Sequence, residues 1–167
     1  MPSLRDPEQL SEHFWRSEFA CRCCGQVNVD PLLIDTLEDY RFDLGAKSVT
    51  VLCGCRCPRH NTEVGGADRS EHLTTGIRAG RAADIRVDGV PLKQLYLAVT
   101  AAGAGAFYSG GVGIYPDQGF LHVDVRGQFA RWGQIGRKKV PFMEAWEYLL
   151  LKERREQAGR DPAGGVV

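Results

Sequence analysis

The fold of this chain is indicated most clearly by residues 111–126, which read GVGIYPDQGFLHVDVR. The segments 111–115 and 120–126 flank the turn sequence Pro-Asp-Gln-Gly, and this arrangement predicts a β-hairpin. In the second segment Leu121, Val123 and Val125 alternate with polar residues, so His122 and Asp124 are expected to project from the same face of the strand. The hairpin therefore predicts a sheet that carries polar side chains on one face.

The rest of the chain adds helices and two more strands to this hairpin. Residues 30–44 have apolar positions at helical spacing, with proline in the first turn and glycine after the end. Residues 91–103 and 141–157 are also predicted helices, and 48–54 and 82–87 are predicted strands. This order predicts a small α+β domain with a mainly antiparallel sheet flanked by helices. We expect the domain to span residues 1–158, followed by a flexible tail over 159–167.

Length and charge exclude several classes of protein. A chain of 167 residues suits one domain, and its 21 Lys and Arg balance its 21 Asp and Glu. This balance gives no indication of a nucleic-acid partner. The longest weakly polar run, 95–108, is too short and too rich in Gly and Thr to span a bilayer, so no membrane partner is expected. We expect a monomer.

Two of the four histidines have a carboxylate placed near them by local structure. His72 is followed by Asp84 across a glycine-rich loop, and His122 shares a strand face with Asp124. Two histidines and one aspartate around zinc leave a fourth position for water. Simple hydrogen-bonded His–Asp pairs are the alternative. We expect His13 to be structural or solvent-facing and His60 to lie in a loop, and the three tryptophans, Trp15, Trp132 and Trp146, to lie in the core.

Several separated motifs together resemble the zinc D-Ala-D-Ala carboxypeptidase family, peptidase family M15, and especially its short subgroup among phage and bacterial cell-wall hydrolases. These motifs are HFWRSEFACRCCG, CGCRCPRHNTEVGGADRSEHL, GRAADI and GGVGIYPDQGFLHVDVRGQFARWG, and they span nearly the whole chain. The resemblance implies the fold shared with the hedgehog signalling domain. It also implies a zinc ion held by His72 in SEHL, Asp84 in GRAADI and His122 in LHVDVR.

The resemblance further implies how a peptide would be bound. Arg56 is expected to hold a substrate carboxylate, for which its planar fork is suited. Ser70 is expected to form a hydrogen bond with the peptide. Asp124 is the candidate general base for this chain because it shares a strand face with His122. Two features depart from the family pattern. The stretch TTGIRA (74–79) is inserted between the first His and the Asp, and Gly119 stands where some relatives carry an acid.

The implied function is zinc-dependent hydrolysis of peptidoglycan peptide bonds, of the D-Ala-D-Ala carboxypeptidase or the endopeptidase type. The partners would be peptidoglycan peptides. A second hypothesis is a non-catalytic zinc-containing module that binds cell wall or forms part of a phage particle, with the inserted loop reshaping the cleft. The charged N-terminal stretch does not resemble a signal peptide. We therefore expect synthesis in the cytoplasm and action on the wall after release or through a separate export route.

Six cysteines form two sequence clusters, CRCC at 21–24 and CGCRC at 53–57. Three interpretations remain open: a second, structural zinc bound by four thiolates, disulfides formed after release, or buried free thiols. A third functional hypothesis, an interaction protein built on a cysteine-bound zinc, depends on the first of these. The candidate residues are Cys21, Cys23, Cys24, Cys53, Cys55 and Cys57.

Overall fold

The computed structural model describes residues 7–102 and 110–160. Its elements are η1 (Arg16–Phe19), α1 (Pro31–Asp43), β1 (Val49–Cys53), α2 (Pro58–Glu63), β2 (Ala82–Val87), α3 (Leu92–Ala102), β3 (Gly111–Tyr115), β4 (Phe120–Asp124), β5 (Ala130–Ile135), β6 (Lys138–Pro141) and α4 (Phe142–Arg160).

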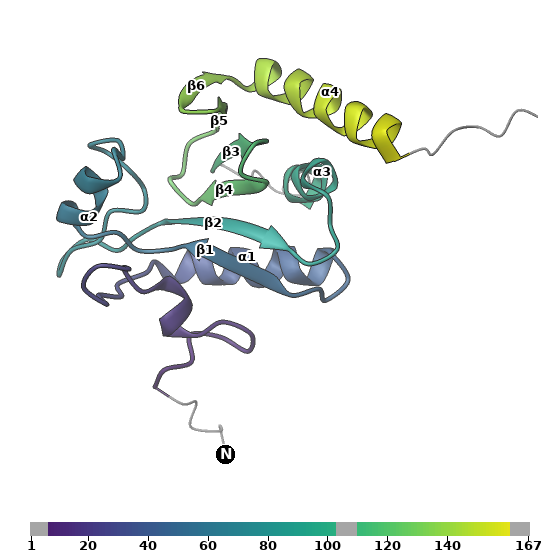
Figure 1. Cartoon of the computed structure of the whole chain (residues 1–167). Helices are drawn as coiled ribbons and strands as arrows, with labels where there is room; N and C mark the ends of the chain where they lie inside the picture. The colour runs from purple at the N-terminus through teal and green to yellow at the C-terminus, as the bar shows by residue number, and fades with distance from the viewer. Residues whose placement is uncertain (1–6, 103–109, 161–167) are drawn as a thin grey trace, which may run out of the picture.

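The prediction of a small α+β fold with a mainly antiparallel sheet is confirmed. One six-stranded sheet has the order β1-β2-β4-β3-β5-β6. The β3–β5 pair is parallel, and every other neighbouring pair is antiparallel. Figure 1 shows α1 running beside β1 and β2, with α4 beyond β5 and β6 at the other end of the sheet. α2 is absent from the predicted elements, and it is the helix that carries His60, which we expected in a loop.

One face of the sheet forms the hydrophobic core. Leu121 and Val123 of β4 are fully buried, as are Val112 and Ile114 of β3. They belong to one cluster with the apolar positions of α1 and α3. Burying each such side chain contributes about 1.5–3 kcal/mol. Because side chains alternate along a strand, His122 and Asp124 lie on the opposite face, as the hairpin predicts.

A single row of residues crosses the whole sheet on this polar face. Asp84 pairs with His122, His122 with Gly113, Gly113 with Trp132 and Trp132 with Pro141, while Cys53 continues the row beyond Asp84. The register of five strand pairs therefore brings together residues from distant parts of the chain. Asp84 and His122, in particular, are direct neighbours in the β2–β4 pair.

Hydrogen bonds to Glu38 connect the N-terminal segment to α1. The Glu38 carboxylate accepts hydrogen bonds from the Ser11 hydroxyl at 2.5 Å, and from the backbone N–H and ring Nδ1 of His13 at 2.9 and 2.8 Å. Burial acts to raise the pKa of Glu38, but the bonds from Ser11 and His13 outweigh it and lower the pKa. His13 thus has the structural role expected of it. The prediction for Trp15 is wrong, because this residue, the N-cap of η1, is 42% exposed.

The C-terminal helix extends slightly into the predicted tail of 159–167. α4 continues to Arg160, and the remaining tail residues, 161–167, lie outside the described residues. Among the described helices, none combines the length and apolarity needed to cross a membrane.

Candidate metal centre

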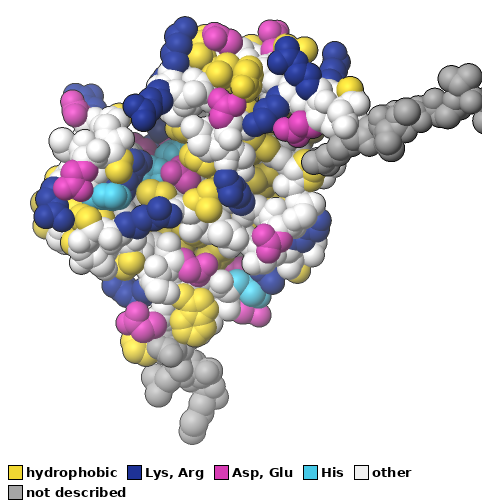
Figure 2. All heavy atoms as spheres, in the orientation of Figure 1, with side chains coloured by type: hydrophobic (Ala, Val, Ile, Leu, Met, Phe, Trp, Pro, Cys, Tyr) yellow, Lys and Arg dark blue, Asp and Glu magenta, His cyan; other side chains and the backbone are white. Residues whose placement is uncertain are grey.

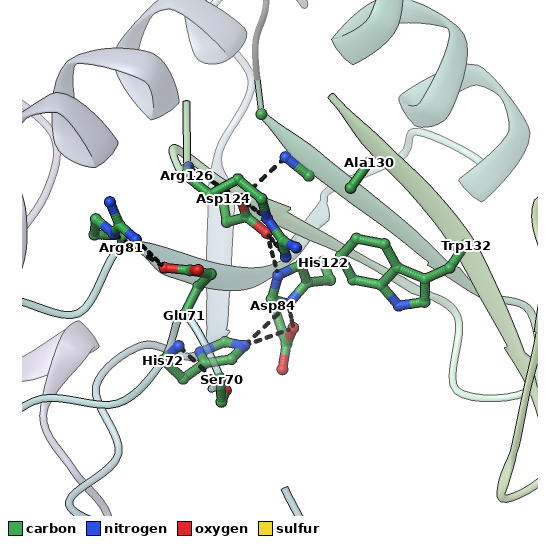
Figure 3. Close-up of polar contacts among 12 residues, drawn as sticks. Ser70, Glu71, His72, Arg81, Asp84, His122, Asp124, Arg126, Ala130 and Trp132 are labelled. Carbon is green, nitrogen blue, oxygen red and sulfur yellow. Dashed lines mark hydrogen bonds and ion pairs between the residues drawn. The ribbon is translucent and has the colours of Figure 1, made fainter. Parts of the chain in front are cut away.

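The three predicted ligands come together on the polar face of the sheet. His72 Nε2 lies 3.0 Å from His122 Nδ1 and 3.3 Å from Asp84 Oδ1, and His122 Nδ1 lies 3.0 Å from Asp84 Oδ1. Figure 3 shows the two rings and the carboxylate converging on one point. Both histidines are buried, at 1% and 6% exposure. Three donor atoms from a loop and two central strands therefore form one small triangle.

The dimensions of this triangle fit a zinc ion. Tetrahedral zinc with bonds of about 2.0–2.1 Å to nitrogen and oxygen places its ligand atoms about 3.3 Å apart. The three observed separations lie at or slightly below this value. Two imidazoles and one carboxylate also form a donor set that zinc accepts, with a fourth position open to water. The residues present thus fit the metal that the sequence implies.

His72 is held so that its Nε2 lone pair faces the triangle. Its Nδ1 donates to the backbone carbonyl of Gly54 at 2.7 Å, which fixes the tautomer. The Arg56 backbone N–H donates to the His72 carbonyl at 2.8 Å, and the His72 N–H donates to the Ser70 hydroxyl at 3.3 Å. Hydrogen bonds from the ring and to the backbone carbonyl of His72 therefore join the loop before β2 to the segment that follows β1.

His122 is oriented in the same way by Asp124. The His122 Nε2–H donates to Asp124 Oδ2 at 3.0 Å, which leaves the Nδ1 lone pair facing Asp84. Asp124 is completely buried and also accepts from Gly111 N at 3.0 Å and from Arg126 Nε and Nη2 at 2.8 and 2.5 Å. The carboxylate lies on the far side of the imidazole from the triangle. This position does not suit the general-base role expected of Asp124, and it suits a residue that positions His122.

The electrostatics of the triangle favour a positive charge inside it. Burial acts to raise the pKa of Asp84, but the imidazoles of His72 and His122 hold it far below its usual range. Burial acts to lower the pKa of each histidine, yet the carboxylates of Asp84 and, for His122, Asp124 raise both on balance. The surroundings therefore keep the Asp84 carboxylate ionised beside the two imidazoles.

The TTGIRA insertion folds away from this site. The Thr74 hydroxyl donates to the Asn28 carbonyl at 2.9 Å, and the Gly80 N–H donates to the same carbonyl at 2.7 Å. These bonds bring the two ends of the inserted loop together, while Ile77 at its tip is fully exposed. No residue of 74–79 lines the cleft above the donor triangle. The insertion therefore lengthens the path from His72 to Asp84 without entering the site.

A cleft of about 530 Å³ opens over the donor triangle. Figure 2 shows the corresponding hollow, with histidine at its base and basic side chains around it. The charged side chains that line the cleft are five cations, Arg56, Arg69, Arg126, Arg137 and Lys139, and two carboxylates, Glu71 and Asp84. This excess of positive charge favours an anionic ligand.

Arg56 and Ser70 both line this cleft, as the sequence predicts for residues that bind the substrate. The Arg56 Nη2 donates to the Ser70 hydroxyl at 3.3 Å, which is the single side-chain hydrogen bond of Arg56 within the described residues. Its buried Nε has no partner there. The remaining guanidinium donors are therefore available to a carboxylate, although the binding role itself stays a prediction.

Trp132 lies at the cleft and not in the core, so the prediction for this residue is wrong. Its ring centroid is 5.1 Å from that of His122, and the cations of Arg126 and Lys139 each lie 5.2 Å from the ring centroid. Gly113 allows this approach, because a Cβ there would lie 2.6 Å from the Trp132 ring. The sequence signal was the glycine at 113, but it becomes informative only once the β3–β5 register is known. Trp146, by contrast, packs against the core as predicted.

Glu71 is a cleft residue that the sequence argument did not single out. Its Oε2 accepts from Arg81 Nε at 3.0 Å, and Arg81 Nη2 lies 2.8 Å from the same oxygen (Figure 3). Its other oxygen has no hydrogen-bond partner among the described residues. Together with Asp84, Glu71 supplies the carboxylates among the described lining residues. The sequence did offer one indication of this role, because Glu71 directly precedes His72, the first predicted ligand.

The six cysteines do not form one cluster. The sulfurs of Cys21, Cys23, Cys24 and Cys57 lie within 4.8 Å of one another. Cys55 is separate, with its thiol donating to the Asn28 carbonyl at 3.4 Å. All six cysteines are free thiols.

Cys53 lies instead beside the donor triangle. It forms a looser group with His72 and Asp84, in which the donor atoms are within 4.8 Å of one another. His122 lies at 3.0 Å from donor atoms of both these residues, so we take the triangle with His122 as the metal centre.

Comparison with known proteins agrees with this geometry. A sequence model of the family described as Peptidase M15 matches residues 12–124, which is more than half of the chain. The probable peptidoglycan L,D-endopeptidase MepK of Haemophilus influenzae is 32% identical over 103 residues, covering 58% of this chain and 50% of the relative. The peptidoglycan L,D-endopeptidase MepK of Escherichia coli K12 is 30% identical over 120 residues, covering 70% of this chain and 62% of the relative. The matched part of the chain thus spans between half and about three fifths of the length of these curated relatives. The family match extends through the stretch that contains His72, Asp84 and His122, and on this basis the chain belongs to the peptidase M15 family.

Proposed function

We propose that this protein is a zinc-dependent peptidase that hydrolyses a peptide bond in the peptide part of peptidoglycan. The observation that carries the proposal is the donor triangle of His72, Asp84 and His122, with separations of 3.0–3.3 Å at the foot of an open cleft. Family membership and the names of the relatives support the same class of substrate.

The residues around the triangle have distinct roles in this proposal. When bound, zinc supplies a water whose pKa is lowered toward about 7 and polarises the substrate carbonyl. His72, Asp84 and His122 would hold the ion, and Asp124 keeps the His122 ring in the required tautomer. Glu71 has one carboxylate oxygen without a partner among the described residues and lines the cleft, so we assign it as the proton acceptor in place of Asp124.

The cleft supports a substrate that carries carboxylates. The cleft lining has more cations than carboxylates, so it favours a peptide that carries free carboxylates. Arg56, with most of its donors available, would bind one substrate carboxylate in a forked arrangement. Because both relatives are named L,D-endopeptidases, we propose cleavage of an internal bond between an L- and a D-residue. Removal of a terminal D-alanine is the alternative specificity.

The test uses the full chain loaded with zinc. It is incubated with purified peptidoglycan and with two synthetic stem peptides, one with an internal L,D bond and one ending in D-Ala-D-Ala, and products are identified by mass spectrometry. His122→Ala should abolish release of products, whereas the matched control His13→Ala, outside the cleft, should retain it. Metal content is measured in parallel. A zinc-loaded protein that releases nothing from any of these substrates would refute the proposal.

The same experiment addresses a non-catalytic role. That hypothesis was motivated by the TTGIRA insertion, which could have reshaped the cleft. Residues 74–79 do not line the cleft, so the structure gives no observation in its favour. Tight binding to cell wall without any turnover is the result that would support it.

A further inference from the structure

Four cysteines from two distant parts of the chain meet outside the catalytic cleft. Cys21, Cys23 and Cys24 belong to one tight turn, and Cys57 precedes α2 (Pro58–Glu63). The Cys21 and Cys23 sulfurs are 3.7 Å apart, the Cys23 and Cys57 sulfurs are 3.2 Å apart, and all four lie within 4.8 Å of one another. None of the four lines the cleft.

The backbone shapes this cluster as a site for thiolates. The turn is closed by the Gly25 N–H donating to the Cys21 carbonyl at 2.8 Å, with Gly25 in the left-handed region at φ +72°. The Cys57 N–H donates to the Cys21 sulfur at 3.3 Å, and the His60 N–H donates to the Cys57 sulfur at 3.4 Å. Backbone donors directed at sulfur stabilise its ionised form, which is the form that binds metals.

The spacing and the donor type identify the ligand. Tetrahedral zinc with Zn–S bonds of about 2.3 Å separates its sulfur atoms by about 3.8 Å. Four thiolates in a closed site are a donor set that selects zinc over the hard cations. We propose that Cys21, Cys23, Cys24 and Cys57 hold a second, structural zinc ion. On binding, the thiols release their protons to solvent, and the positive charge of the Arg59 guanidinium, which interacts electrostatically with Cys23 and Cys57, offsets part of the negative charge of the complex.

The position of this site gives it a structural task. It joins the N-terminal turn to Cys57, which directly follows Arg56, and α2 leads from there into the part of the cleft wall formed by residues 64–67, 69 and 70. The zinc would therefore hold one wall of the cleft against the N-terminal segment. Since tight turns and six-residue helices have little apolar surface to bury, a metal is an effective means of fixing them.

Metal counting separates this site from the catalytic one. The chain is purified under reducing conditions, and zinc is measured by elemental mass spectrometry. We expect about two zinc ions per chain for the wild type and about one for His122→Ala, because three-ligand and four-cysteine sites each hold one ion. Cobalt added to metal-stripped His122→Ala should give intense sulfur-to-cobalt charge-transfer absorption. Cys57→Ser in this background should abolish that absorption, whereas the matched exchange Cys55→Ser, outside the cluster, should preserve it.

Two results would overturn the proposal. One is a His122→Ala chain that binds neither zinc nor cobalt under reducing conditions. The other is a wild-type chain whose intact mass is lower by two hydrogens, with Cys23 and Cys57 joined in a disulfide and no metal at the cluster. If Cys57→Ser does not fold, protection of the His122→Ala thiols from alkylation, lost on adding a chelator, decides the question. Failure here leaves the hydrolytic proposal intact, since that depends on His72, Asp84 and His122.

Discussion

Replacing Asp124 by Asn tests whether this residue positions His122 or acts as the general base. In the structure Oδ1 of Asp124 accepts from Gly111 and Arg126, and Oδ2 accepts from His122 and Arg126. The amide nitrogen that Asp124→Asn introduces must therefore face at least one N–H group, whichever way the side chain is turned. If it faces His122, the ring is driven to the tautomer whose Nδ1 carries a proton toward the metal.

The size of the effect follows from this role. Losing such a supporting carboxylate costs about 10–100-fold in metal affinity, which is about 1.4–2.7 kcal/mol. Zinc affinity is measured by competition with a chromogenic chelator, and hydrolysis is measured at saturating zinc. We expect the Asp124→Asn affinity to fall within that range, with a smaller loss of rate once zinc is saturating. Asp88→Asn, the same exchange at an exposed carboxylate after β2, should leave both quantities unchanged.

The opposite pattern would refute the reasoning. If Asp124 is the general base, metal affinity stays unchanged while the rate at saturating zinc falls by about 10²–10⁴-fold. Unchanged affinity combined with such a loss of rate would return Asp124 to the general-base role expected from the strand face that it shares with His122.

The remaining predictions concern the cleft and the N-terminal segment. Glu71→Gln should lower kcat by about 10²–10⁴-fold with zinc content unchanged, and a near-normal kcat would remove Glu71 as proton acceptor. Arg56→Lys should lower kcat/KM by about 10–150-fold, mainly through KM, since a charged hydrogen bond contributes about 1.5–3 kcal/mol. Gly113→Ala should displace Trp132 and destabilise the fold by about 1–3 kcal/mol, measured by urea unfolding. The lowered pKa of Glu38 contributes stability that is present above its unfolded value of about 4.3 and is lost as pH falls through the folded pKa. Urea unfolding of Glu38→Gln should therefore show a smaller loss of stability between about pH 5 and pH 3 than the wild type.

The fold could be predicted where local sequence and tertiary burial agree. The β3–β4 hairpin combines a turn sequence with alternating burial, and α1 has Asp30 as its N-cap, with the Leu32 N–H bonded to its carboxylate at 3.0 Å. β5 and β6 were missed because each has only one buried residue, so no alternation of buried and exposed positions marks them. α2 was missed because it is short and polar, and its N-cap is a cysteine, Cys57, which is not among the usual capping residues.

The candidate site shows a different limit of sequence reasoning. The resemblance located His72, Asp84 and His122, which the structure brings together, although their role as metal ligands stays a prediction. The role of Asp124 could not be read from strand alternation. Alternation shows that it shares a face with His122, but only the three-dimensional arrangement shows on which side of the imidazole it lies. Position in the sheet and direction of a side chain are separate pieces of information.

The way in which the inserted loop closes on Asn28 has a consequence for how such proteins diverge. The distance between His72 and Asp84 is set by hydrogen bonds at the loop ends and by the β2–β4 register, not by the number of residues in between. Loops closed in this way gain or lose residues at an entropic cost that grows slowly with length. Evolution can therefore change this interval freely while the donor atoms keep their places. Searches for related enzymes should align the two strands first and allow any interval between the first histidine and the aspartate.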